Sequence, residues 1–293
     1  MKFKIIVFLL ILSSKGILIF GHEGMWIHSL LKVIEEDMQS NGLELSAEDI
    51  YSINNSSLKD AIVHFGGGCT AEVVSKQGLI LTNHHCGYSQ IQQHSTLENN
   101  YLKDGFWAMS KIEELTNPGL TATFIVSIKD VTNEVFIDTS GLSNSEFKKI
   151  ISKNILKIQN QSGNQPNYKY VVKPFFYGNK YYLITSKTYK DVRLVGAPPS
   201  AMGKFGGDTD NWVWPRHTCD FSVFRIYANQ ENEPADISEN NIAYSAPVAL
   251  DVKVSGIKEN DFSMVFGFPG KTEQYLTSNA VDNYINIILP ARI

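Results

Sequence analysis

His85 is the residue of this chain whose surroundings are most typical of a general base. It follows two short apolar runs, residues 71–74 and 79–81, which flank a Ser-Lys-Gln-Gly turn, and it directly precedes Cys86. Apolar runs separated by such a turn predict a β-hairpin. We therefore expect the imidazole at the exit of an ordered strand, where it can take a proton from a nucleophile supplied elsewhere in the fold. The hairpin alone is equally compatible with a buried, hydrogen-bonded histidine beside a structural cysteine.

Three cysteines, Cys69, Cys86 and Cys219, allow one disulfide and leave one thiol. Cys69 and Cys86 stand at the two ends of the predicted hairpin, which makes them the natural pair. Closing so short a loop stabilises a fold by roughly 3 kcal/mol in the loop-entropy model. We expect this disulfide to fix the strand end that carries the histidine, and we expect Cys219 to be a buried, unreactive thiol.

The composition is that of a globular protein and bears on its partners. Of the 293 residues, 43% are hydrophobic, which is enough for one large domain or two small ones. Lysine and arginine total 26 against 30 aspartates and glutamates, and no basic cluster stands out along the chain. Because phosphate backbones are bound by basic stripes, we expect no nucleic acid partner.

Residues 1–21 have the pattern of a secretory signal peptide. Lys2 and Lys4 precede an apolar run, and Lys15 separates that run from a second apolar patch. A spanning helix needs about 20 consecutive apolar residues, so we expect no stable membrane span. We predict that these residues are removed and that the protein is exported to the periplasm, the cell surface or the medium. A retained membrane anchor is the alternative.

Periodicity along the rest of the chain predicts a mainly β protein with helical insertions. Helical spacing of apolar residues covers 25–38 and 143–159, and a capping-box pattern begins at Ser46. Residues 200–217 have neither period and are predicted to form a long loop, and residues 277–293 begin a helix. The predicted strands, apart from the first hairpin, cover residues 120–131, 168–176, 181–188, 192–195, 221–227, 246–254 and 262–268.

A second stretch rich in polar and aromatic residues ends at the predicted strand 221–227. Its sequence from residue 207 is Gly-Asp-Thr-Asp-Asn-Trp-Val-Trp-Pro-Arg-His-Thr-Cys-Asp-Phe, and Asp220 stands directly before the strand. A general-base histidine needs an acid that orients its ring through the other nitrogen and stabilises the imidazolium as it forms. Asp220 has the position for that role.

Both stretches closely resemble motifs of the bacterial dipeptidyl-peptidase 7 and 11 family. The motifs are Gly-Gly-Gly-Cys-Thr-Ala-Glu with Thr-Asn-His-His-Cys-Gly-Tyr, and Asp-Thr-Asp-Asn-Trp-Val-Trp-Pro-Arg-His-Thr with the later Asp-Phe. The resemblance implies an exported serine exopeptidase that releases dipeptides from peptide N-termini. It also implies a chymotrypsin-like double β-barrel with an inserted helical domain. Residues 22–245 would form the first barrel with insertions, residues 246–280 the opening hairpin of the second barrel, and residues 281–293 the start of the helical domain.

Carried onto this sequence, the resemblance makes His85 the general base and Asp220 its orienting acid. It makes Asn211 and Trp212 the residues that hold the terminal ammonium of a peptide substrate, for which an amide oxygen and an aromatic face are suitable partners. Peptides with a free N-terminus are thus the implied partners, and the family's enzymes tend to form homodimers. Trp214 is as compatible with core packing as with substrate contact. Structural roles are expected for His84, Asp208, Asp210 and His217.

The sequence departs from the family pattern in two ways. Cys219 stands where the family usually has glycine, directly before the acid, which allows local strain or a shifted acid there. The family nucleophile lies in a Gly-Asn-Ser-Gly-type turn, whereas the Ser-Gly pairs here are Ser162-Gly163 and Ser255-Gly256, neither in that context. We therefore expect these residues to be the N-terminal portion of such an enzyme, to lack the nucleophilic serine, and to be inactive alone.

Two other functions are compatible with parts of the pattern. A catalytically inactive peptide-binding module, or a decayed copy with half a peptidase fold, would keep the same motifs without a nucleophile. A metal-dependent hydrolase would use His84, His85, Cys86 and His94, but adjacent ligands on an extended chain diverge and no C-x-x-C or H-x-x-x-H spacing is present. We therefore expect no metal and no cofactor.

Overall fold

The computed structural model describes residues 25–292 except for residues 208, 211, 212, 214, 260 and 271–275. The described strands are β1 (Ile62–Phe65), β2 (Cys69–Val73), β3 (Leu79–Thr82), β4 (Phe106–Trp107), β5 (Leu115–Thr116), β6 (Ala122–Asp130), β7 (Tyr168–Phe175), β8 (Lys180–Tyr189), β9 (Asp191–Ala197), β10 (Ser222–Ala228) and β11 (Ile242–Ala243). The α-helices are α2 (Glu35–Ser40), α3 (Ala47–Ile50), α4 (His84–His94), α5 (Tyr101–Asp104), α6 (Thr132–Val135), α7 (Asn144–Ser162), α8 (Ser200–Gly203) and α9 (Ser278–Asn283). Short 3₁₀ or π turns cover His28–Val33, Leu58–Ala61, Lys111–Glu113, Phe176–Gly178, Tyr284–Ile288 and Pro290–Arg292.

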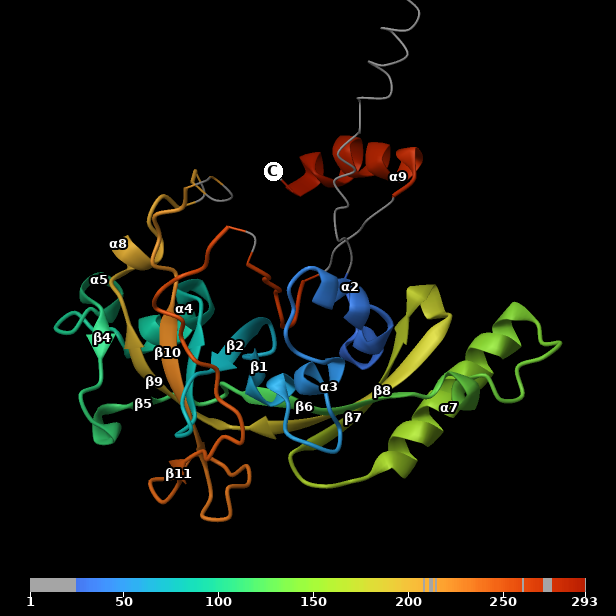
Figure 1. Cartoon of the computed structure of the whole chain (residues 1–293), viewed down its shortest axis with the longest axis horizontal. Coiled ribbons are helices and arrows are strands. Elements are labelled where there is room, and N and C mark those ends of the chain that lie inside the picture. The colour runs from blue at the N-terminus through green and yellow to red at the C-terminus, as the bar shows by residue number, and fades with distance from the viewer. Residues whose placement is uncertain are drawn as a thin grey trace, which may run out of the picture.

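The described strands form a single antiparallel sheet, which confirms the predicted mainly β architecture (Figure 1). Its order is β4-β9-β10-β3-β2-β1-β6-β8-β7, with β5 added to β9 and β11 added to β10. β2 and β3 are the hairpin predicted before the candidate base. The strands predicted at residues 168–176 and 181–188 are β7 and β8, which pair with each other. α7 lies beside them and is capped by a reciprocal Ser143–Glu146 capping box.

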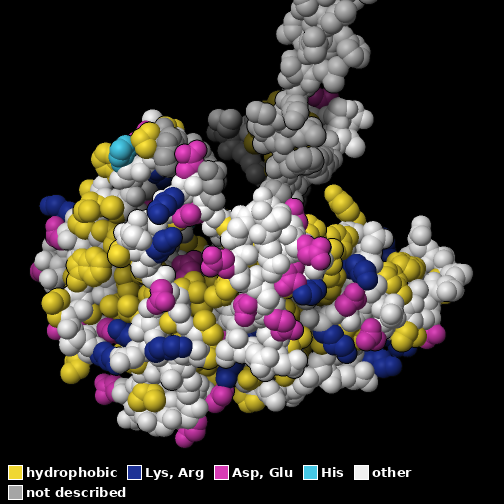
Figure 2. Space-filling view, in the orientation of Figure 1, with side chains coloured by type: hydrophobic (Ala, Val, Ile, Leu, Met, Phe, Trp, Pro, Cys, Tyr) yellow, Lys and Arg dark blue, Asp and Glu magenta, His cyan; other side chains and the backbone are white. Residues whose placement is uncertain are grey.

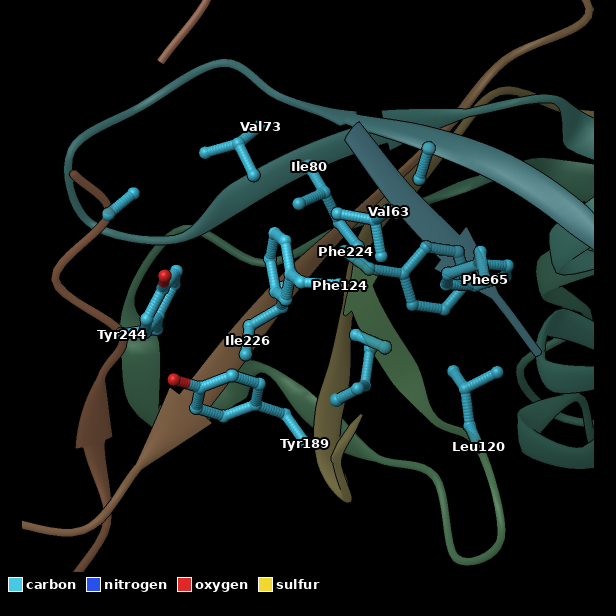
Figure 3. Close-up of a cluster of buried hydrophobic side chains, with 14 of the residues drawn as sticks. Val63, Phe65, Val73, Ile80, Leu120, Phe124, Tyr189, Phe224, Ile226 and Tyr244 are labelled. Carbon is cyan, nitrogen blue, oxygen red and sulfur yellow. The ribbon is translucent and has the colours of Figure 1, made fainter. Parts of the chain in front are cut away.

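The main core lies inside the curl of this sheet (Figure 3). Strands from separate parts of the sheet order, such as β10 and β6, contribute to one buried cluster, so the sheet must curl around it. The seven residues of β10 are buried with one exception, which is the pattern of a strand covered on both faces. The largest side chains of the cluster are those of Phe65, Ile80, Ile91, Leu120, Phe124, Tyr189, Leu194, Phe224, Ile226 and Tyr244.

On the side of β10 away from this core, a buried charged network joins it to β9 and β5. Glu114 accepts hydrogen bonds from Arg225 Nε and from the Tyr227 hydroxyl, both at 2.8 Å. Arg193 donates to both carboxylate oxygens of Asp191 at 2.9 and 2.8 Å, and its guanidinium lies 3.8 Å from the centroid of the Tyr227 ring. Each buried charge in the network thus has a counter-charge. The network links β9 to β10, the strand that follows the candidate acid.

Two predictions for the periphery were wrong. The helix predicted over residues 25–38 is divided into a 3₁₀ turn and α2, which meet at Ile34. The strand pair predicted at 246–254 and 262–268 does not form. Pro247 has no N–H for a ladder, so its segment makes isolated bonds such as Leu250 N to Val73 O at 2.8 Å. In the second segment Phe262 and Phe266 pack instead into the cluster formed by the N-terminal helices.

The surface of the described residues carries both charge signs. Lysines and arginines are interspersed with aspartates and glutamates over the face shown in Figure 2. Among the described helices, none has both the length and the apolar character that crossing a bilayer requires.

His28 gives the fold a predicted pH dependence. Its ring packs edge-on against Phe266 at a centroid distance of 4.4 Å, and its Nδ1 is buried without a hydrogen-bond partner. Burial lowers the pKa of His28 to about 4. Since the unfolded histidine titrates near 6.5, the unfolded chain binds more protons between pH 6.5 and 4. Stability is therefore full above pH 6.5 and falls toward pH 4, by up to about 3 kcal/mol from this residue.

Urea unfolding at several pH values between 4 and 7 measures this effect. His28→Gln should be less stable than the parent at pH 7 but should lose less stability on acidification. An unchanged pH slope in His28→Gln would contradict the assignment. His64 and His84, whose pKa values are also lowered by burial, contribute slopes of the same sign and remain in both proteins.

Candidate active site

His85 lies in the first turn of α4, immediately after β3. The sequence predicted that it would leave a strand, but β3 ends at Thr82 and Asn83 is already the N-cap residue of the helix. The helix places successive side chains about 100° apart, so His84 and His85 still point in different directions. His84 is buried, whereas the side chain of His85 is 67% exposed.

Asp220 is brought to His85 by strand pairing. It precedes β10, and β10 pairs with β3 so that Ser222 lies opposite Thr82. Nδ1 of His85 and Oδ2 of Asp220 are 2.9 Å apart. The other carboxylate oxygen, Oδ1, accepts a hydrogen bond from the backbone N–H of His85 at 3.2 Å. Asp220 thus orients the imidazole and also supplies negative charge at the N-terminus of α4, where it is favourable.

Two further residues hold the His85–Asp220 pair, and the sequence motifs predicted a site role for neither. The side-chain amide of Asn83 donates to Oδ2 of Asp220 at 3.1 Å and to its carbonyl oxygen at 3.2 Å. The Ser222 hydroxyl donates to the carbonyl oxygen of Asn83 at 2.8 Å. Asparagine before a helical run is a capping signal, so the start of α4 could have been read from the sequence. The contact of Asn83 with a residue 137 positions away could not.

Glycine at position 87 lets α4 approach β10 closely. A Cβ atom on Gly87 would lie 2.7 Å from the Ser222 hydroxyl and 3.0 Å from the ring of Phe224. Ile91, one turn further on, is fully buried in the main core. The helix that carries His85 therefore rests directly on the strand that follows Asp220.

The predicted disulfide between Cys69 and Cys86 is confirmed, and it ties the start of β2 to the first turn of α4. The prediction for Cys219 was wrong, because this thiol is free and exposed. Its loop lies outside the core and is held by a backbone bond from Cys219 N to Met202 O at 3.0 Å. The φ angle of Cys219 is not positive, so the position does not impose the left-handed strain that would favour glycine.

His84 joins α4 to the loop that begins at α8. Its side chain is buried against Gly203, where a Cβ atom would lie 2.4 Å from the imidazole ring. Burial lowers the pKa of His84, partly opposed by Asp220, so the ring is neutral near pH 7. This packing anchors the loop that runs to Asp220.

The residues predicted to hold a substrate ammonium, Asn211 and Trp212, lie outside the described residues, as do Asp208 and Trp214. Asp210 is described. Its carboxylate lies over Gly206, where a Cβ atom would be 2.2 Å from it, and its backbone N–H donates to the Gly206 carbonyl oxygen. This is the conformation of a turn residue, as expected for Asp210. His217 is exposed.

Nε2 of His85 is the ring nitrogen that this arrangement leaves for proton transfer in the candidate site. With Nδ1 held by Asp220, the neutral ring carries its lone pair on Nε2. No described residue makes a hydrogen bond to that atom. The candidate site therefore holds an imidazole oriented by a carboxylate, on a side chain that is 67% exposed.

Comparison with known proteins places the chain in a family. The model of the peptidase S46 family matches residues 21–293. The chain belongs to the peptidase S46 family. Among its relatives, an Asp/Glu-specific dipeptidyl-peptidase of Capnocytophaga gingivalis is 52% identical over 278 residues, covering 94% of this chain and 39% of the relative. A dipeptidyl-peptidase 7 of the same organism is 47% identical over 286 residues, covering 97% of this chain and 40% of the relative.

Solved structures extend the similarity of this S46 chain to three dimensions. Porphyromonas endodontalis DPP11 in complex with the dipeptide Arg-Asp has a TM-score of 0.85 and 46% identity, covering 92% of this chain and 40% of that one. The same enzyme in complex with Arg-Glu has a TM-score of 0.81 and 45% identity, covering 89% and 38%. The S46 chain described here thus spans about two fifths of the length of these relatives.

Proposed function

We propose that this chain carries the general base and its orienting acid for a serine-type dipeptidyl-peptidase. The observation that carries the proposal is the 2.9 Å contact between His85 Nδ1 and Asp220 Oδ2, on a His85 side chain that is 67% exposed, in a chain of the S46 family. A pair with this geometry can accept a proton from a hydroxyl and stabilise the resulting imidazolium.

In the proposed reaction, His85 takes the proton of a serine hydroxyl as that oxygen attacks the carbonyl carbon of the second peptide bond. The imidazolium then gives this proton to the leaving amine, and a second cycle with water releases the dipeptide. The serine and its oxyanion hole come from sequence beyond these 293 residues, in a second barrel of which residues 246–280 are the beginning. Residues 22–245 are the first barrel in this scheme, and residues 281–293 begin the helical domain.

The proposed substrates are peptides with a free N-terminus. Asn211 and Trp212 hold the terminal ammonium, which fixes the distance from the N-terminus to the bond that meets the nucleophile. Support comes from the relatives, whose names specify dipeptidyl-peptidases and whose complexes contain dipeptides. The proposal includes export, with residues 1–21 as the signal peptide, and a homodimer of the complete enzyme.

The test uses the complete gene product that contains these residues and dipeptidyl-aminomethylcoumarin substrates. Acidic and apolar residues should be compared at the second substrate position, since the relatives include Asp/Glu-specific enzymes and dipeptidyl-peptidase 7. We expect release of coumarin from substrates with a free amine and none from their N-acetyl forms. Equal cleavage of acetylated substrates would refute the exopeptidase assignment, and no cleavage at all would favour the inactive peptide-binding module.

The 293-residue chain alone provides a second test. Without a nucleophile it should leave all these substrates intact, because little rate enhancement remains when the serine and oxyanion hole are absent. Coumarin release by the chain alone, abolished by His85→Ala, would show that the nucleophile lies within these residues.

Asn83 should act as a positioning residue in this reaction. Asn83→Ala removes the 3.1 Å hydrogen bond to the Asp220 carboxylate, and a bond to a charged group contributes about 1.5–3 kcal/mol. We expect kcat to fall by roughly tenfold or more at nearly unchanged KM. Steady-state kinetics of Asn83→Ala and of Asn99→Ala, an exposed asparagine after α4, measure this. A similar fall in both variants, or a change confined to KM, would contradict the positioning role.

A further inference from the structure

The imidazole of His85 lies close to the sulfur atoms of Cys69 and Cys86. We propose that reduction of the Cys69–Cys86 disulfide converts these three side chains into a Zn²⁺ site. The two sulfur atoms and one ring nitrogen of His85 all lie within 4.8 Å of one another. In the part of the chain that the structure describes, no other group of histidine, cysteine, aspartate or glutamate side chains gathers three ligand atoms so closely. While the sulfurs are bonded to each other they cannot bind a cation, so the site depends on the redox state.

The backbone already brings the three donors close together. Zn–S bonds of about 2.3 Å and Zn–N bonds of about 2.0–2.1 Å put ligand atoms roughly 3.5–3.8 Å apart, so shifts of about 1 Å suffice. The Cα atoms of Cys69 and Cys86 are 6.2 Å apart. Cys69 is held by pairing with Phe65 of β1, and Cys86 N donates to the Asn83 carbonyl oxygen at 3.2 Å. Because these contacts do not involve the disulfide, reduction frees the sulfurs while they still face each other.

The imidazole already has the surroundings of a metal-binding histidine. Such histidines usually donate their second ring N–H to a carboxylate, which fixes the tautomer and the ring orientation. The Nδ1 atom of His85 has that partner in Asp220, and its Nε2 is left to bind. The side chain of His85 is 67% exposed, and both cysteines are partly exposed, so a cation can enter from solvent.

Reduction of the Cys69–Cys86 disulfide precedes metal binding. A dithiol reduces the S–S bond by exchange, passing its two protons to the cysteine sulfurs and forming its own disulfide. A phosphine reduces it together with one water, which supplies the two protons and the oxygen of the phosphine oxide. Zn²⁺ then displaces the two thiol protons, which leaves two thiolates, a neutral imidazole and one water around the ion. The two thiolates cancel the charge of the ion. Thiolate and imidazole donors favour Zn²⁺ over Mg²⁺ or Ca²⁺.

One consequence rests on the proposed function. With Zn²⁺ bound to Nε2, the lone pair of His85 cannot accept a proton from a serine hydroxyl. Zinc would therefore inhibit the peptidase under reducing conditions and leave the oxidised enzyme active. Zinc binding itself does not depend on peptidase activity, so the two proposals can fail separately.

The test measures metal binding to the 293-residue chain in a Cys219→Ser background, which removes the third thiol. Co²⁺ is the spectroscopic probe, and Zn²⁺ displaces it. After reduction with a phosphine, we expect one Co²⁺ per chain with the intense visible bands of tetrahedral coordination and a near-ultraviolet thiolate-to-metal band. The oxidised protein should show neither band. Identical spectra in the oxidised and reduced proteins, or no tetrahedral spectrum after reduction, would overturn the proposal.

Further variants distinguish Co²⁺ binding at the folded site from Co²⁺ binding to the two cysteine thiols of an unfolded chain. His85→Ala should weaken Co²⁺ binding by about tenfold or more, and Asp220→Asn, which alters the outer contact, by about tenfold. His94→Ala removes a histidine at the other end of α4 and should leave the affinity unchanged. Near-ultraviolet circular dichroism must show that the reduced chain keeps its fold. Loss of the fold on reduction, or equal affinity in His85→Ala and its parent, would refute a site built by β2 and α4.

Discussion

Asp220→Asn is expected to lower kcat of the complete enzyme about 10⁴-fold, the order observed when a triad acid loses its charge. Asparagine offers an amide where Oδ2 now accepts from Nδ1 of His85. An N–H facing Nδ1 favours the tautomer that carries its proton on Nε2, which cannot act as a base. Measuring kcat and KM with a dipeptidyl-coumarin substrate checks the size of the effect, and most of it should appear in kcat.

Two comparisons show whether the effect comes from the pair. His85→Ala should be at least as severe as Asp220→Asn, and the double variant should be no worse than His85→Ala, because residues that act as a unit are not additive. Asp236→Asn, at an exposed aspartate paired with Lys190, serves as the matched control and should keep full activity. A loss below tenfold in Asp220→Asn, with the fold intact, would remove Asp220 from the proposed mechanism.

Phe224→Ala is expected to cost about 3–5 kcal/mol of unfolding free energy, the range for deleting a large buried aromatic side chain. Phe224 is fully buried, and its ring centroid lies 4.8 Å from that of Phe65 (Figure 3). It also supports α4 directly, since the ring packs against Gly87. The cavity would therefore open beneath the helix that carries His85. Urea unfolding of the 293-residue chain, followed by tryptophan fluorescence and by circular dichroism, measures the loss.

Phe205→Ala is the matched control, because Phe205 is 55% exposed. It should change the unfolding free energy by less than about 1 kcal/mol. Similar losses in the two variants would mean that the main core is not the source of stability. Phe224→Leu, which retains part of the volume, should recover some of the stability lost in Phe224→Ala.

The sequence was informative where local pattern and chemistry agreed. The β2–β3 hairpin, the strands β7 and β8 and the Ser46 capping box of α3 follow from alternation, turn residues and capping, which are local rules. The position of Asp220 before an apolar strand was also readable. Its role beside His85 remains a proposal, although the structure brings the two side chains to 2.9 Å.

Local rules failed where tertiary contacts decide. Residues 262–268 read as a strand, but Phe262 and Phe266 are drawn into the helical cluster around Leu31 and Leu43. Cys219 was expected to be buried because free cysteines usually are, yet it lies on a loop outside the core. The Asn83–Asp220 contact depends on β3–β10 pairing, which no window of the sequence contains.

The pairing of β3 with β10 determines when His85 and Asp220 meet during folding. His85 and Asp220 are 135 residues apart in the chain, and they meet only when Ser222 has found Thr82 across the two strands. A shift of one residue would turn the side chains of β10 to the opposite face. Contacts of such long sequence separation form late, because a large loop must close first. A nascent or partly folded chain therefore has no assembled His85–Asp220 pair.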